Sequence, residues 1–357
     1  MALSVREVGD IPVNGRGMPM RGDEEGAEHP ARPPSRRGVL AGGAAFAAAG
    51  LLARPARAAV RLRLAHGLPR AHPVHRAMLH FADLVSERSG GEITVTLYAD
   101  GVLGEEPTLL DQVRTGTLDM TKASASVLDV VSPLYRLFDI PFLLRDKEHW
   151  RKVVSGAPGE RILQAPGPSG MTGLCFYDAG ARSFYGRRPI ARPEDLAGLK
   201  IRVQPSPTMV RMVQTLGAEA VPLPWGVVYT ALQTGLIDGA ENNLTALIYG
   251  RHAEVTRHYA YTEHTMVPDV LLIGARTWAA LRPPLRDIVR AAAAESAMLQ
   301  SALWANAEEA SRAGAERLGV VFSYPDKAPF IARLSAMRRE FMTDPTLAPL
   351  IAQVEGA

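Results

Sequence analysis

The sequence is poor in cysteine and lacks the motifs of the common enzyme classes. Cys175 is the single cysteine among 357 residues, which excludes an intramolecular disulfide and a cysteine-rich metal site. Its neighbours Leu174 and Phe176 predict a small buried residue there rather than a nucleophile. The chain contains no G-x-S-x-G nucleophile elbow, no P-loop and no G-x-G-x-x-G after a strand. We therefore predict neither a catalytic site nor a bound cofactor.

The first 58 residues have the pattern of an export signal that is removed. Ser35–Leu40 (SRRGVL) is typical of a twin-arginine signal, the apolar run Gly38–Leu52 follows, and Ala56–Ala58 forms an A-x-A cleavage site. The alternative, an uncleaved anchor, is disfavoured because this run is short and only weakly apolar for a bilayer span.

Upstream of that signal, the polar segment 1–34 predicts a disordered extension, unless Met18 or Met20 is the true start. Cleavage after Ala58 removes eight arginines and six acidic residues, so the net charge falls from +3 to about +1. A nearly neutral domain with interspersed charges is not expected to bind nucleic acid. No later apolar run reaches the length of a membrane span.

The rest of the chain has the periodicity of an α/β protein. Residues 60–65 and 93–98 alternate as strands on either side of a helical pattern at 72–86. The continuous apolar run 267–273 predicts a buried strand. A helical pattern then runs from Leu285 to about Leu318, roughly 50 Å at 1.5 Å per residue. A helix of that length exceeds the width of one lobe, so we expect it to brace two.

Two short segments echo each other 119 positions apart. Val113–Asp119 (VRTGTLD) and Leu232–Asp238 (LQTGLID) each predict a helix ending at a glycine that can take the left-handed conformation, followed by a strand. Together with the second α/β region, this echo favours two similarly built lobes over a single sheet.

Two arginines in the stretch Gly180–Asn243 are placed differently from the surface arginines. Arg182 lies in a Gly/Ala/Ser turn, and Arg202 lies inside the strand pattern Leu199–Val203. A guanidinium in a cleft binds a carboxylate through paired, planar donors. From the local pattern alone, the alternative is an exposed arginine on an edge strand.

Several motifs in this stretch resemble the solute-binding proteins of tripartite ATP-independent periplasmic (TRAP) transporters, the DctP family. They are Phe184–Ile190, PEDL at 193–196, GLKIRV at 198–203, and YTALQTGLIDG at 229–239 followed by Glu241 and Asn242. The resemblance covers Val60 to about Phe341.

The family resemblance implies an α/β fold of the two-lobed periplasmic binding protein type. A ligand cleft would lie between the lobes, and the long C-terminal helix would brace both. Residues 59–179 and about 268–307 would form lobe one. Residues 180–267 and about 308–357 would form lobe two.

The resemblance also implies six ligand-binding residues: Arg202, Arg182, Asn242, Trp225, Ser124 and His66. Arg202 would pair with a substrate carboxylate, Arg182 would add a second cationic contact, and Asn242 would hydrogen-bond the ligand. The alternative for Trp225 is plain core packing.

Acidic and histidine residues elsewhere have simpler interpretations. The adjacent pairs Glu105-Glu106 and Glu308-Glu309 are interpreted as solvated charge. Ser124 falls where some relatives have an acidic residue. A pocket poor in acidic residues favours a simple organic acid as the ligand.

His72 and His75 have a spacing that suits two metal ligands, but Pro73 places them on a fraying first turn. We interpret them as solvated and predict no metal.

We predict a monomeric periplasmic protein that captures a small organic acid by lobe closure and delivers it to the membrane subunits of a TRAP permease. C4-dicarboxylates are one such class, although two arginines suit monocarboxylates equally. One alternative is an α/β enzyme acting on a carboxylate in the same cleft, which the missing catalytic motifs disfavour. Another is a ligand-binding partner of a membrane sensor.

Export gives the first testable prediction. If Arg36 and Arg37 mark a twin-arginine signal that is cleaved after Ala58, the periplasmic protein begins near Ala59. N-terminal sequencing of the periplasmic fraction tests this. A protein that retained residues 1–58 would contradict it.

Overall fold

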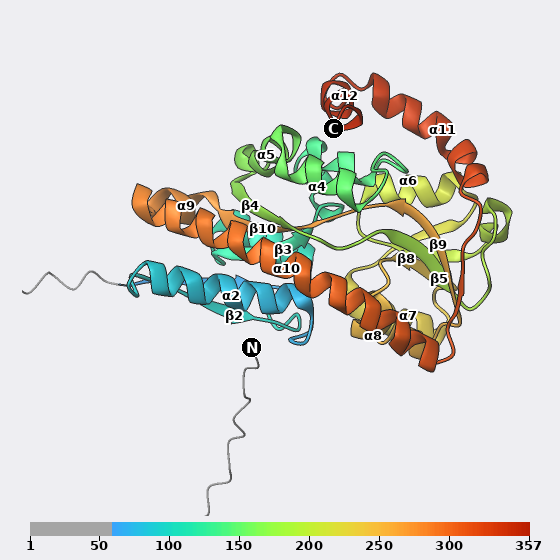
Figure 1. Cartoon of the computed structure of the whole chain (residues 1–357), viewed down its shortest axis with the longest axis horizontal. Helices are drawn as coiled ribbons and strands as arrows, with labels where there is room; N and C mark the ends of the chain where they lie inside the picture. Colours follow the sequence, from blue (N-terminus) through green and yellow to red (C-terminus); the bar gives the residue numbers. More distant parts are fainter. Residues whose placement is uncertain (1–58) are drawn as a thin grey trace, which may run out of the picture. The chain divides into compact units, whose positions relative to one another are not determined.

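The computed structural model describes residues 59–357, so the predicted export signal lies outside the described residues. The described part contains two β-sheets with helices packed around them (Figure 1). The first sheet has the order β2-β1-β3-β10-β4, formed by β1 (Val60–Ala65), β2 (Ile93–Tyr98), β3 (Met120–Ser124), β4 (Met171–Tyr177) and β10 (Asp269–Gly274). The second has the order β11-β9-β5-β8-β6-β7, formed by β5 (Arg182–Gly186), β6 (Lys200–Val203), β7 (Glu219–Pro222), β8 (Gly239–Asn242), β9 (His258–Thr265) and β11 (Val321–Ser323).

Helices connect these strands. The α-helices are α2 (Pro73–Arg88), α3 (Glu106–Thr115), α4 (Lys147–Ser155), α5 (Ala157–Gln164), α6 (Pro207–Thr215), α7 (Val228–Thr234), α8 (Ala246–Tyr249), α9 (Ala275–Ala280), α10 (Pro283–Arg317), α11 (Ala328–Thr343) and α12 (Ala348–Glu355). The 3-10 helices are η1 (Val127–Val130), η2 (Pro133–Asp139), η3 (Gly167–Ser169), η4 (Pro193–Leu196), η5 (Trp225–Val227) and η6 (His252–Glu254). This architecture confirms the predicted two-lobed α/β fold. Within residues 59–357, no helix combines the length and apolar character needed to cross a membrane.

The echoed segments have the predicted geometry. Helix α3 ends at Gly116 with φ 81°, and α7 ends at Gly235 with φ 76°. Both angles lie in the left-handed region that glycine adopts without steric cost. Strands β3 and β8 follow these turns, one in each sheet. The repeated motif therefore builds the same helix–glycine–strand unit twice.

The chain passes between the two sheets at three places. Residues 178–181 lead from β4 to β5, and residues 266–268 lead back from β9 to β10, which pairs antiparallel with both β3 and β4. Helix α10 is the third connection. The predicted boundaries between the lobes stay predictions, and the last helix, α12, packs against α5.

Helix α10 confirms the predicted long brace. Its N-terminal half buries Leu285 and Val289 in a core shared with α2 and the first sheet. Near its C-terminal end, Ala315 belongs to a core that contains Tyr185 and Tyr259 of the second sheet. Figure 1 shows α10 running from beside α2 to α8, and it contacts both helices. One rigid helix is thus anchored in the cores of both sheets.

The middle of α10 is hydrogen-bonded to the end of β4 and to the connecting segment that follows it, residues 178–181. Gln300 is fully buried, and its Nε2 donates to the carbonyl oxygen of Asp178 at 2.7 Å. Its Oε1 accepts from the backbone N–H of the same residue at 2.8 Å. One turn earlier, the hydroxyls of Ser296 and Tyr177 lie 3.0 Å apart. A buried peptide group in a crossing segment has no sheet partner, so a side-chain amide satisfies it.

Replacing this amide should destabilise the protein. Gln300→Leu keeps similar bulk but leaves the N–H and C=O of Asp178 unpaired, at a cost of about 1–3 kcal/mol for each buried group. Urea unfolding measures the effect. Met298→Ala is the matched control, because Met298 lies on the same helix with 69% of its surface exposed. Equal free energies of unfolding for the two variants would show that the hydrogen bonds from Gln300 to the backbone of Asp178 do not stabilise the protein.

Candidate functional site

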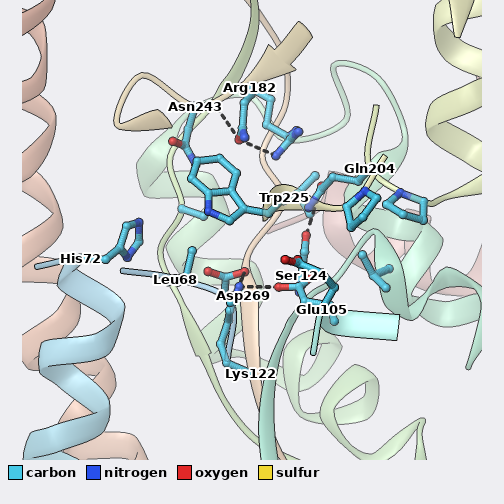
Figure 2. A pocket seen from close by; sticks show the side chains of 18 of the residues that line it. Leu68, His72, Glu105, Lys122, Ser124, Arg182, Gln204, Trp225, Asn243 and Asp269 are labelled. Atoms are coloured by element: carbon cyan, nitrogen blue, oxygen red, sulfur yellow. Dashed lines mark hydrogen bonds and ion pairs between the residues drawn. The ribbon is translucent and has the colours of Figure 1, made fainter. Parts of the chain in front are cut away.

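One cavity is lined by residues from both sheets and from the loops that follow their strands. Figure 2 shows Arg182 and Trp225 on one side and Ser124, Lys122 and Asp269 on the other. Ser124 and Asn242 end β3 and β8, and Arg202 lies one residue before the end of β6. The ends of strands from both sheets therefore place polar side chains in the wall of this cavity.

Arg182 is a fully paired cation. Its Nε donates to Oε2 of Glu241 at 2.6 Å, and its Nη2 donates to Oε1 and to the main-chain oxygen of Glu241, both at 2.8 Å. Nη1 donates to Oδ1 of Asn242 at 2.8 Å. Burial alone would raise the pKa of Glu241, but Arg182 and its hydrogen bonds lower it to about 2. The pair carries no net charge, and it fixes Asn242 beside the cavity.

Arg202 differs because no carboxylate pairs with it among the described residues. Its Nε and Nη2 donate to the carbonyl oxygen of Leu223 at 2.9 and 2.7 Å. Its Nη1 is buried and has no hydrogen-bond partner within residues 59–357. Burial, together with the nearby Arg182, lowers the pKa of Arg202 to about 10. The protein thus holds a desolvated cation without a direct carboxylate partner in the cavity wall, which an anion would stabilise.

A second cation is held between acids. Lys122 Nζ lies 2.5 Å from Oε1 of Glu106 and 2.9 Å from Oδ1 of Asp269. Burial alone would lower the pKa of Lys122, but Asp269 and Glu106 raise it. This triad corrects the interpretation of Glu106 as solvated charge. It also corrects the expectation of a pocket poor in acids, because Glu105, Glu106 and Asp269 all line the cavity.

Glu105 is the least satisfied of these acids. It precedes α3 but makes no capping hydrogen bond with its side chain. Its Oε2 is buried and has no hydrogen-bond partner in the described part of the chain. Burial raises the pKa of Glu105, while a hydrogen bond from the backbone of Gly226 opposes the rise. An oxygen of this kind is an acceptor for a hydroxyl group.

Five of the six predicted ligand residues line the cavity: Ser124, Arg182, Arg202, Trp225 and Asn242. The Ser124 hydroxyl also donates to Oε1 of Gln204 at 3.2 Å, which joins β3 to the residue after β6. His66 is not among the lining residues. Its Nε2 lies 2.9 Å from Nδ1 of His75, and its Nδ1 accepts from the backbone of Leu68.

The histidines are buried rather than solvated, which corrects the sequence interpretation. His72 and His75 are only 5% and 4% exposed. His72 accepts from the backbone N–H of Val74 at the start of α2, and burial lowers its pKa to about 3. A neutral histidine that caps a helix end needs no solvent. No group of three or more potential ligands is arranged to hold a metal ion in residues 59–357.

Sequence reasoning missed Lys122, Glu105, Glu106, Gln204 and Asp269. One signal was available, because Lys122 interrupts the otherwise uncharged strand Met120–Ser124, which is buried at every position. A lysine at such a position requires acidic partners. The partners themselves come from residues 16 and 147 positions away, so their identity depends on the fold.

A two-lobed α/β protein with an unpaired arginine in a polar cavity between its sheets has the features of a solute-binding protein for acids. Comparison with known proteins gives the family. Residues 64–344 match the DctP family, described as "Bacterial extracellular solute-binding protein, family 7". The chain belongs to this family, which confirms the resemblance found in the sequence.

Three relatives illustrate the similarity. The 2,3-diketo-L-gulonate-binding periplasmic protein YiaO of Escherichia coli is 30% identical over 320 residues, 88% of this chain and 96% of that protein. A TRAP periplasmic solute-binding protein of Xanthobacter autotrophicus with bound β-D-galacturonate is 39% identical, with a TM-score of 0.81 over 83% of this chain and 99% of that one. A Pseudomonas putida protein with bound D-glucuronate is 31% identical, with a TM-score of 0.81 over 84% and 97%.

The free amide of Asn242 generates a prediction. Its oxygen is used by Arg182 and by the backbone of Asn243, whereas its nitrogen makes no hydrogen bond within the described residues. Asn242→Ala should therefore weaken ligand binding by about 1–3 kcal/mol. Calorimetry measures this, with Asn306→Ala on the exposed face of α10 as the control. Unchanged affinity in Asn242→Ala would place this side chain outside the ligand site.

Proposed function

We propose that this protein captures a uronate, a sugar carrying one carboxylate and several hydroxyls, and delivers it to a TRAP membrane permease. The observation that carries the proposal is Nη1 of Arg202, a buried cationic donor without a partner in the described part of the chain. A carboxylate bound there would receive Nη1 and the second N–H of Nη2 together, in the planar geometry that guanidinium offers.

The charge balance of the cavity favours one carboxylate over two. Arg182 is neutralised by Glu241, and Lys122 lies between Glu106 and Asp269. Among the described residues that line the cavity, Arg202 is the cation without a carboxylate partner, so it is the one left to receive an anion. A second carboxylate would approach Glu105, whose oxygen accepts hydrogen bonds but repels a negative charge. A C4-dicarboxylate is therefore the less suitable ligand.

The remaining polar groups suit hydroxyls. Glu105 offers an unpaired acceptor oxygen, and Asn242 offers an amide nitrogen. Hydroxyls donate and accept at once, so they satisfy both kinds of group. The half-buried indole of Trp225 adds an apolar surface suited to the carbon face of a sugar ring. The galacturonate and glucuronate in the related structures support this choice.

We also propose that the protein has no catalytic activity and acts in the periplasm after export. Family membership supports binding and transport rather than turnover. Incubation with galacturonate should therefore return the sugar unchanged, which chromatography would show. Any accumulating product would favour the enzyme alternative.

Arg202 provides the sharpest test. Removing one member of a buried charge pair costs about 2–5 kcal/mol, so Arg202→Ala should weaken galacturonate binding by roughly 30-fold to several thousand-fold. Arg202→Lys should recover only part of this loss, because an ammonium is a point charge without the planar fork. Isothermal calorimetry measures both.

The matched control is Arg339→Ala, an exposed arginine on α11. Without ligand, Arg202→Ala should melt near the wild-type temperature, because the loss of the two hydrogen bonds to Leu223 is offset by the removal of a buried cation that has no carboxylate partner. The ligand-induced rise in melting temperature should largely disappear. If Arg202→Lys bound as tightly as wild type, the paired contact would be refuted and Arg182 would become the better candidate.

A further inference from the structure

Glu105 occupies the N-cap position of α3, but its side chain makes no capping hydrogen bond to that helix. The backbone N–H of Gly226 donates to its carboxylate instead. Glu105 follows β2 of the first sheet, whereas Gly226 lies in η5, just after β7 of the second sheet. One carboxylate therefore links the loops of the two sheets that form the cavity.

The start of η5 needs an acceptor of this kind. The first N–H groups of a helical segment have no partner within it, and they favour a negative charge nearby. The N-cap residue of η5 is Pro224, which makes no side-chain hydrogen bond to this turn. The cap that the local sequence does not provide is thus supplied by Glu105 from the other sheet.

The contact requires a glycine at position 226. A β-carbon there would overlap Oε1 of Glu105, and the next nearest atoms are Cδ and Oε2 of the same side chain, at 3.2 and 3.8 Å. The backbone itself does not require glycine, because Gly226 lies in a 3-10 turn and its φ is not positive. The missing side chain therefore serves the close approach of Glu105.

We propose that the bond between Glu105 and Gly226 is a closing contact, which holds the two sides of the cavity together over a bound ligand, with Glu105 as a positioning residue. This inference rests on the proposed function. Trp225, the neighbour of Gly226, lines the cavity, so the closing contact also fixes the indole. Gly226 is not among the lining residues, so it acts without touching the ligand.

The two oxygens of Glu105 divide the work between the protein and the ligand. One lies against Gly226, while Oε2 is buried and has no hydrogen-bond partner within residues 59–357. A ligand hydroxyl that donates to Oε2 would keep the carboxylate in the position that the closing contact needs. The bond from Ser124 to Gln204 also joins the two sides, at 3.2 Å, but it is neutral. A hydrogen bond to a charged acceptor is about twice as strong, so Glu105 contributes the larger share of these two.

The experiment measures the dissociation of galacturonate from the full mature protein by stopped-flow displacement, followed by tryptophan fluorescence. Gly226→Ala should release the ligand roughly 10- to 100-fold faster than wild type, the loss of one hydrogen bond to a charged group. Its association rate should change little, because no ligand contact is removed. Gly356→Ala is the matched control, since Gly356 is an exposed glycine at the end of α12 with φ −84°.

A double variant isolates the closing contact from other roles of these residues. Glu105→Ala should also release galacturonate faster. In that background Gly226→Ala should have no further effect, because the three atoms nearest to the new β-carbon belong to the side chain that has been removed. Glu105→Gln keeps one acceptor oxygen and should recover part of the loss.

Each outcome decides one proposal. Wild-type dissociation in Gly226→Ala, or losses that multiply in the double variant, would overturn the closing contact and leave uronate capture intact. Failure of galacturonate to bind wild type would overturn the proposed function and the closing contact with it. Thermal melting of each ligand-free variant excludes misfolding as the cause of faster release.

Discussion

The site depends on an arginine whose charge the protein leaves uncompensated. Arg182 and Arg202 are both buried and lie near each other, but the protein provides a carboxylate partner for only one of them. Arg182 receives the whole carboxylate of Glu241, while Arg202 receives only the carbonyl oxygen of Leu223. Burying a cation without a direct counter-ion is costly, and a carboxylate bound as proposed would remove that cost. The proposed affinity for acids rests on this asymmetry rather than on the number of basic residues.

The fold supports that asymmetry by holding two sheets in a fixed relation. Arg182 and Glu241 lie on the paired strands β5 and β8, so sheet register brings them together. The inner acids arrive from the other sheet and from α3. Gln300 and Ser296 of α10 fix the start of the crossing that leads to Arg182. A displacement of residues 178–181 would move Arg182 and Asn242 together. Helix α10 therefore fixes the positions of these two side chains by holding the backbone that precedes Arg182.

The cavity combines paired charges with polar atoms that have no partner within residues 59–357. Arg182 pairs with Glu241, and Lys122 pairs with Glu106 and Asp269, whereas Arg202 has no carboxylate partner within residues 59–357; the proposed preference for one carboxylate rests on this difference. Glu105 also lines the cavity, and its buried Oε2 has no hydrogen-bond partner within the described residues. An oxygen of this kind suits a hydroxyl of the proposed ligand.

The sequence by itself determined the fold class, the long brace helix and the two glycine-terminated turns, because hydrophobic period and left-handed glycines are local properties. Motifs around Arg182, Arg202, Asn242 and Trp225 were also readable, since each lies in a contiguous segment. Only the tertiary structure decided that Arg182 is neutralised and Arg202 is not, that Lys122 lies between Glu106 and Asp269, and that His66 faces His75 instead of the cavity. The ion pairs among these depend on residues far apart in the chain, and electrostatic pairing is set by distance in space, which no local pattern encodes.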